Sequence, residues 1–178
     1  MRSIVILTLC FVLGLFPVFA QEAGKFRTGF EIGYCGPPHG EIGLLQTIEL
    51  KYNLQNNMSV GLNEEVALMI KNKSYNANVF SLSVTYDYYF HSESSRFSPF
   101  IGTGLGYYFC VVEHFADGLT KFNNPGCSFR VGFELSKFRM SVNYNLNRKT
   151  SKKNEWIYHN DYISFNTGFY LGGGKWKK

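Results

Sequence analysis

Apolar and polar side chains alternate with a period of two along most of the chain after residue 25. Residues 98–110 show the pattern most clearly, since one face carries Ile101, Thr103, Leu105, Tyr107 and Phe109. The other face carries Gly102, Gly104, Gly106 and Tyr108. A period of two is that of a β-strand, whose successive side chains point to opposite sides of the sheet. Glycines gathered on one face indicate close approach or strong curvature, so this stretch predicts a strand in the wall of a small closed barrel.

Seven further segments alternate in the same way and predict strands. They are residues 25–35, 44–54, 58–69, 79–90, 127–136, 138–147 and 161–171. In the third strand Glu64 takes an apolar-face position, and a β-bulge near Asn63 and Glu64 is the expected way to re-aim the pair. Together with residues 98–110, these segments predict an all-β chain that folds as an eight-stranded antiparallel up-and-down barrel.

The connections between these strands alternate in length. Longer, polar ones cover residues 36–40, 71–78, 111–125 and 148–160, whereas those at 55–57, 91–97 and 137 are mostly shorter. Transmembrane β-barrels have short periplasmic turns and longer external loops. The predicted strands also approach the 9–11 residues that cross a bilayer at the usual tilt. The layout therefore favours a transmembrane barrel.

The same alternation would suit a soluble barrel, in which the apolar face points inward. Here the apolar face is large and aromatic near the strand ends, where interface girdles sit, and the opposite face is small, polar and rich in glycine. That second face also carries charges of both signs, namely Glu31, Glu49, Lys51, Asp87, Arg130, Glu134 and Arg139. In a membrane barrel they would line the lumen and need to pair, and this arrangement is the favoured one.

The first twenty residues read as a secretory signal peptide. They hold a basic Arg2, a long apolar run and a small residue at Ala20, after which cleavage is expected. A transmembrane anchor is the alternative, but the apolar run is short for a spanning helix. We therefore expect residues 1–20 to be a cleaved signal peptide and residues 21–178 to form a single outer-membrane barrel domain.

The net charge of +5 and the pI near 9.0 change this picture little. Basic residues are scattered through the chain, apart from one cluster within residues 148–153. Export makes nucleic acid a poor partner, and anionic lipid head groups are the more natural contact for positive charge.

Three cysteines remain after cleavage: Cys35, Cys110 and Cys127. Cys110 and Cys127 flank one predicted loop, and in an oxidising compartment a disulfide between them is possible. Their strand parity differs, however, and the odd count leaves at least one thiol unpaired within the chain. The pairing stays open.

Three histidines, His39, His114 and His159, fall in predicted external loops near acidic residues. A metal site or a general base is conceivable there, but no tight ligand spacing such as HExxH is present. The chain also has no phosphate-binding loop and no paired Cys-x-x-Cys. We therefore expect no catalytic residue, no cofactor site and no metal site.

The signal peptide, the strand PFIGTGLGYYF and the eight-strand meander resemble the small bacterial outer-membrane β-barrel family, the OmpA-transmembrane-domain and OmpX-like "porin family" proteins. The resemblance implies a Gram-negative outer membrane and insertion by the barrel assembly machinery. It does not imply an open pore, because side chains fill the interior of eight strands. Members usually end on an aromatic assembly signal. Phe169 and Tyr170 fit it, although a tail of residues 175–178 runs past them.

The resulting hypothesis is an integral outer-membrane barrel with a structural or surface-interaction role. Its partners would be outer-membrane lipid, the assembly machinery and an extracellular partner contacted through loops 111–125 and 148–160. One alternative is a soluble exported lipocalin-like barrel that binds an apolar ligand. Another is a lipid-modifying barrel enzyme, but the His and Ser two apart on a late strand, as in lipid A deacylases of similar architecture, are absent from residues 138–147 and 161–171.

Overall fold

The structure is a computed structural model, and it describes residues 22–36, 42–72, 75–90, 97–114, 118–147, 150–151, 157–158 and 161–173. The expected signal peptide of residues 1–20 and the tail of residues 175–178 lie outside this part. Within it, no helix is long and apolar enough to cross a membrane.

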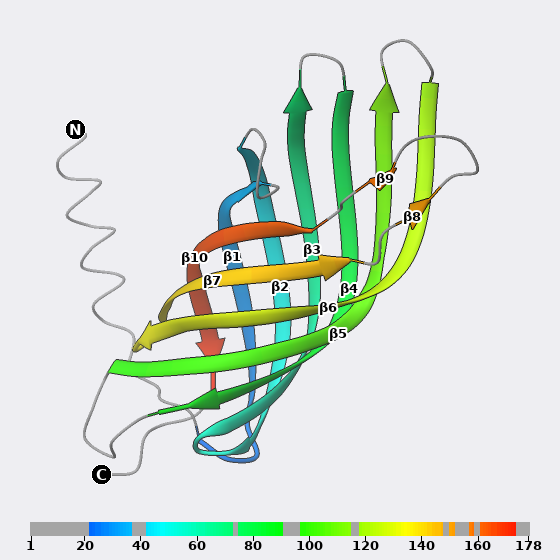
Figure 1. Ribbon diagram of the computed structural model, residues 1–178. Coiled ribbons are helices and arrows are strands. Elements are labelled where there is room, and N and C mark those ends of the chain that lie inside the picture. The colour runs from blue at the N-terminus through cyan, green and yellow to red at the C-terminus, as the bar shows by residue number, and fades with distance from the viewer. Residues whose placement is uncertain are drawn as a thin grey trace, which may run out of the picture.

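Eight of the strands form a closed barrel (Figure 1). Their bounds are β1 Phe26–Gly36, β2 Gly43–Gln55, β3 Met58–Asn72, β4 Tyr75–Tyr89, β5 Phe97–His114, β6 Gly118–Leu135, β7 Phe138–Asn147 and β10 Tyr162–Gly172. Each strand pairs antiparallel with its sequence neighbour, and β10 closes the ring by pairing with β1 and β7. The predicted fold class is confirmed.

The connections divide the barrel into two ends. The β2–β3 and β6–β7 turns lie at the same end as the start of β1 and the end of β10 (Figure 1). At this end the start of β1 and the end of β10 are hydrogen-bonded, because Gly173 N–H donates to Phe26 O at 3.0 Å. We call this the turn end. The connections after β1, β3, β5 and β7 lie at the other, loop end, as the sequence predicts. The expected alternation of their lengths is wrong in part: β3 runs to Asn72 and β4 begins at Tyr75, where a loop over residues 71–78 was expected, whereas the turn-end connection between β4 and β5 covers residues 90–96.

The β5–β6 hairpin corrects the loop that was expected at residues 111–125. Both strands are 18 residues long, and the ladder continues from Cys110 opposite Phe122 to His114 opposite Gly118. The expectation was wrong because a strand beyond the bilayer faces water on its outer side, so it carries polar residues there, such as the exposed Lys121 and Asn123. Figure 1 shows the hairpins β3–β4 and β5–β6 extending past the other strands at the loop end.

A smaller ordered feature lies in the second expected contact loop, residues 148–160. There β8 (Thr150–Ser151) pairs antiparallel with β9 (Ile157–Tyr158). The remainder of that loop lies outside the described residues.

The β-bulge expected near Asn63 and Glu64 is also wrong. Register runs unbroken through both positions, with Glu64 opposite Ile48 on β2 and opposite Leu82 on β4. The register shifts lie instead near the strand ends, between Asn53 and Gln55 and between Ile70 and Asn72. The alternation never failed on β3, and Glu64 simply faces outward.

Candidate functional site: the bore and the outer wall

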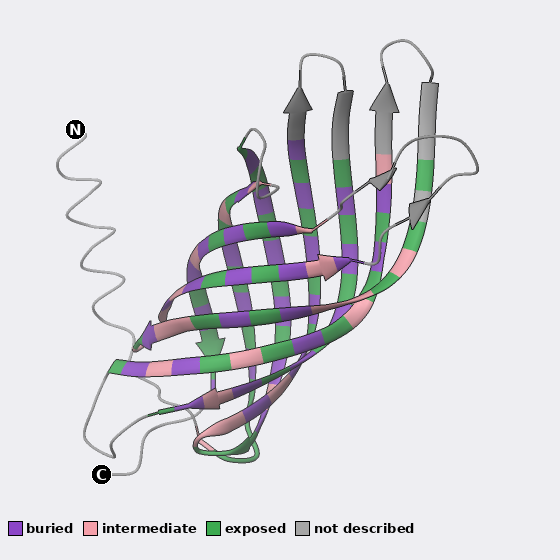
Figure 2. Ribbon diagram, viewed as in Figure 1, coloured by how far each residue is buried: buried purple, intermediate pink, exposed green. Residues whose placement is uncertain are grey.

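Burial is inverted relative to a water-soluble barrel (Figure 2). Large apolar side chains cover the outer surface, for example Leu105 at 69 % exposed and Val84 at 61 %. Charged side chains fill the bore, where Lys51 and Asp87 are 0 % exposed. The side-chain orientation predicted for a membrane barrel is therefore confirmed. In water, a barrel with this apolar outer surface and these buried charges would be unfavourable on both counts.

Aromatic pairs ring the outside of the barrel at the turn end. Their ring centroids lie 4.8 to 5.5 Å apart, and the pairs are Phe26–Tyr52, Tyr88–Phe90, Phe97–Phe133 and Phe138–Phe169. They come from β1–β2, β4 and the residue after it, β5–β6, and β7–β10. Such a girdle is typical of the boundary between bilayer and water.

Asp87 lies at the centre of the charge cluster in the bore. Its carboxylate pairs with the Lys51 ammonium, accepts from Arg130 Nε at 2.6 Å and accepts from Arg139 at 3.2 Å. Glu49 on β2 accepts from Arg130 at 2.7 Å and lies 3.4 Å from Lys51. Since these five residues come from β2, β4, β6 and β7, the cluster spans the bore.

A third carboxylate extends this cluster toward the turn end. Glu134 accepts from Arg27 at 2.7 and 3.1 Å and from Arg139 at 3.0 Å. Tyr89 O–H donates to Glu134 at 2.9 Å, and the Arg27 guanidinium donates to the Tyr89 oxygen. The bidentate Arg27–Glu134 contact is the geometry of a strong charge-assisted pair.

Aromatic rings fill the space around these charges. The Arg139 guanidinium lies 3.7 Å from the centroid of Phe100, and Tyr170 O–H donates to Glu31 at 2.9 Å and also to Glu49. The cluster is thus packed as well as paired, and it closes the bore at its level.

One buried carboxylate stands apart from the cluster. Glu65 is 4 % exposed and accepts from Tyr162 O–H, and no cationic side chain pairs with it among the described residues. The expected bulge concealed this residue from the sequence interpretation. Arg27, which also belongs to the bore, was placed on the polar face but not among its paired charges. In both cases unbroken alternation was the signal.

A second, apolar layer closes the bore nearer the loop end. Its buried members are Cys35, Leu45, Ala67, Met69, Val79, Tyr108, Cys110 and Tyr162. Both tyrosine hydroxyls of this layer are hydrogen-bonded: Tyr108 O–H donates to Asn145 Oδ1 at 3.1 Å, and Tyr162 O–H donates to Glu65. We call this group the apolar layer.

Little free space remains between the two layers. A cavity of about 10 Å³ lies there, lined by polar groups that include Thr47, Asn63 and Ser83, and it admits on the order of one water molecule. A cavity of this size and polar lining does not suit the apolar ligand of a lipocalin-like carrier.

The cysteines at residues 110 and 127 are not joined. Cys110 lies opposite Phe122 and faces the bore, whereas Cys127 lies opposite Leu105 and is only partly exposed. The extended β5–β6 ladder separates the two residues, and their opposite parity points them to different faces.

Most residues of the histidine hypothesis lie outside the described part. His39 and His159 are not described, and His114 is described only as the end of β5. Within the described residues, no three His, Cys, Asp or Glu side chains could hold a metal ion together. The metal hypothesis at the loop end stays untested.

Solved structures of other proteins share the fold of this chain. No family model and no curated protein matches the sequence. Among solved structures, Neisserial surface protein A aligns with a TM-score of 0.63 at 15% identity, covering 84% of this chain and 97% of that one. The N-terminal barrel domain of Pseudomonas aeruginosa OprF aligns at 0.56 and 12% identity, covering 85% and 100%. OprG of the same organism aligns at 0.50 and 11%, covering 85% and 98%.

These likenesses extend over nearly the whole described barrel. The chain has the fold of the small eight-stranded outer-membrane β-barrels, in agreement with the resemblance found in the sequence. At such low identities the likeness shows the fold, and function has to be argued from this chain's own residues.

Proposed function

We propose that this chain is an integral β-barrel of a Gram-negative outer membrane, with a structural or surface-interaction role and without a general pore. The observation that carries the proposal is the inverted burial of a closed barrel: an apolar, aromatic-ringed outside around a charged and filled inside. Only a bilayer makes that surface favourable. The names of the similar structures, which include outer-membrane and surface proteins, point the same way.

The absence of a general pore is supported by the two closures of the bore. The charge cluster around Asp87 and the apolar layer lie at different heights along the barrel axis. The cavity between them has a volume of only about 10 Å³. Catalysis is not part of the proposal, because the charges of the cluster around Asp87 are engaged with one another and the polar cavity beside it has a volume of only about 10 Å³.

The surface role rests on the length of the hairpins. A strand of about 9–11 residues crosses a bilayer, so the 18 residues of β5 and of β6 extend beyond it. An extracellular partner would meet the tip of this hairpin together with residues 148–160. Outer-membrane lipid would cover the belt, by which we mean the band of outward-facing apolar side chains around the barrel. The barrel assembly machinery would insert residues 21–178 after cleavage of a signal peptide at residues 1–20.

The test is fractionation of bacterial cells that express the full chain. We expect the protein in the outer membrane, resistant to carbonate extraction, with a gel mobility that shifts on boiling as folded barrels do. Its mass should show loss of residues 1–20. Recovery of soluble protein from the periplasm would reject the proposal. Binding to a host-cell or matrix surface, compared between the full chain and one with a shortened β5–β6 hairpin, tests the surface role separately.

A further inference from the structure

The outer wall of the barrel carries a polar seam where only apolar side chains are expected. Glu64 faces outward on β3 and is exposed, with Val60 and Leu62 before it and Val66 and Leu68 after it on the same face. Since β3 enters the belt near Val60 and leaves it near Leu68, Glu64 lies close to mid-membrane. Ionisable side chains are rare at that depth and normally mark a functional contact.

Gln46 extends the seam onto the neighbouring strand. It is exposed on β2 opposite Val66, and Glu64 is opposite Ile48, so Gln46 and Glu64 are diagonal neighbours on the outer face. Such neighbours lie about 7–8 Å apart, within reach of long side chains. Among the described residues, neither side chain makes a hydrogen bond within the chain, so their polar groups are open to the membrane.

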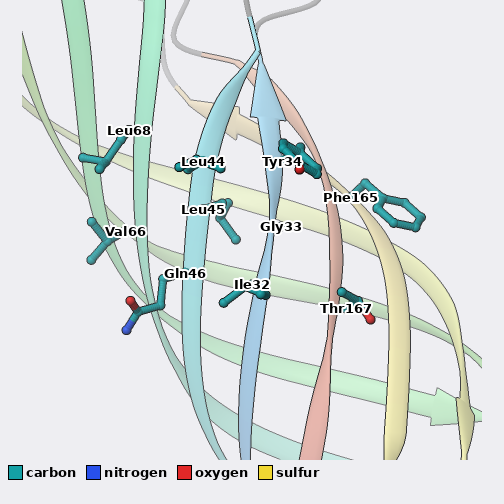
Figure 3. A pocket seen from close by; sticks show the side chains of 10 residues that line it. All are labelled: Ile32, Gly33, Tyr34, Leu44, Leu45, Gln46, Val66, Leu68, Phe165 and Thr167. Atoms are coloured by element: carbon teal, nitrogen blue, oxygen red, sulfur yellow. The ribbon is translucent and has the colours of Figure 1, made fainter. Parts of the chain in front are cut away.

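A groove runs beside this seam. It has a volume of about 670 Å³ and crosses β10, β1, β2 and β3, with Ile32 and Val66 among its apolar lining. Figure 3 shows Gln46 and Thr167 on either side of Ile32, and Gln46 is exposed while Thr167 is half-buried. The register agrees, because Ile32 pairs with Thr167 on one side and with Gln46 on the other.

The opposite wall provides an internal comparison. A second groove of about 570 Å³ crosses β4, β5, β6 and β7, and it too contains an outward threonine, Thr103. That hydroxyl is satisfied within the chain, because it donates to Ser128 O at 3.1 Å. The Thr103 hydroxyl is therefore engaged within the chain, in contrast to the side chains of Gln46 and Glu64 on the β10–β3 wall.

We propose that the β10–β3 wall binds the same wall of a second copy of this chain within the membrane. The reason for a second copy is self-complementarity: Gln46 carries an amide N–H that donates, and Glu64 carries a carboxyl oxygen that accepts. A two-fold contact presents each group of one copy to the other group of its partner and satisfies both pairs at once. Polar contacts of this kind hold membrane segments together, and the groove gives the facing apolar side chains room to interdigitate.

This inference rests on the proposed membrane location, and its test keeps the two apart. The full chain with Cys127→Ser is expressed in bacteria with either Val66→Cys on the β10–β3 wall or Val142→Cys on the opposite wall. Outer membranes are then treated with a short bismaleimide. We expect a covalent product of twice the chain mass from Val66→Cys and none from Val142→Cys, two exposed valines on opposite sides of the barrel.

Two substitutions then test the seam itself. Glu64→Leu and Gln46→Leu, each in the Val66→Cys chain, should lower the yield of dimer about tenfold, the scale of the two polar contacts that either substitution removes from a two-fold dimer. Leu82→Ala, next to Glu64 on the outer face, serves as a matched control and should leave the yield unchanged. Heat-shifted gel mobility and outer-membrane recovery report folding and insertion in every variant, and Glu64→Leu should preserve both because leucine suits the belt.

Several results would overturn the proposal while leaving membrane insertion intact. They are equal cross-linking from both walls, no product from Val66→Cys, or a product whose mass identifies a different protein. A monomer that retains a bound lipid only when Glu64 is present, seen by native mass spectrometry, would assign the wall to lipid instead. Absence of every variant from the membrane would reject the proposed function itself.

Discussion

Asp87 illustrates how single residues hold this barrel closed from inside. Three cationic side chains, Lys51, Arg130 and Arg139, converge on its carboxylate. The chain makes room for them, because Gly102 lies opposite Asp87 in the ladder and a Cβ atom there would overlap Asp87 Oδ1 and lie 3.0 Å from Arg130 Cγ. Gly102 thus makes room for the charge cluster, whereas Gly104 and Gly106 on the same face lie against uncharged groups such as Ser128 and Ser83.

We expect Asp87→Asn to lower the free energy of unfolding by about 3–5 kcal/mol, because removing one partner leaves buried cations uncompensated. Urea titration of the protein folded in lipid vesicles, followed by tryptophan fluorescence and gel mobility, measures the change. Glu65→Gln is the matched control, since it makes the same chemical change on a buried carboxylate with no cationic partner among the described residues. The glutamine oxygen can still accept from Tyr162, so we expect a loss below about 1 kcal/mol. Equal losses in the two variants would show that the cluster has no special weight.

At the scale of the element, each long strand has two parts. Within the bilayer its outward-facing residues must be apolar, whereas beyond the bilayer they face water and can be polar. The bounds of β1, β2, β7 and β10 could be read from alternation to within a residue or two, because the membrane imposes apolar outward positions along them. The same rule stops at the bilayer surface. There Lys121 and Asn123 face outward without penalty, and the sequence pattern of residues 118–125 resembles that of a loop.

The bore shows a similar division. Parity alone placed Glu31, Glu49, Lys51, Asp87, Arg130, Glu134 and Arg139 inside, and the structure confirms it. Which charges meet could not be predicted, because partners such as Lys51 and Asp87 come from strands that do not pair with each other and depend on the shear of the closed barrel. Glu64 and Glu65 were missed for the opposite reason: a bulge was invoked to rescue a pattern that was already intact.

We expect the water-exposed end of the β5–β6 hairpin to be dispensable for folding. Deleting residues 112–120 and joining Val111 to Lys121, which are paired in the ladder, through an Asn-Gly turn preserves register in a two-residue hairpin. The belt and the bore are untouched, so the urea midpoint should correspond to a change below about 1 kcal/mol, measured in the same vesicles as the parent chain. A deletion of equal length inside the belt, residues 101–109, is the control and should abolish the heat-shifted band. Loss of folding in the hairpin variant would mean that the extension nucleates or braces the barrel.

At the scale of the whole molecule, the bore is blocked at two levels of different chemistry. The charge cluster around Asp87 closes it nearer the turn end, and the apolar layer closes it nearer the loop end. A single local opening therefore leaves the other level in place. Permeation of a polar solute would require both to give way in the same molecule.

We accordingly expect no uptake of arabinose by vesicles that contain the folded protein, and none when Tyr162→Ala thins the apolar layer alone. Tyr162 is fully buried and bonds Glu65, so its removal opens space at that level, whereas Arg27, Asp87, Arg139 and their partners still cross the bore. Vesicle swelling measured by light scattering, with a general porin at the same protein-to-lipid ratio as the positive control, gives the rates. Gel mobility must show the variant folded, so that a lack of swelling reflects a closed barrel. Swelling by the parent chain at a rate comparable to the porin would contradict the filled bore, and swelling by Tyr162→Ala alone would show that the charge cluster does not seal its own level.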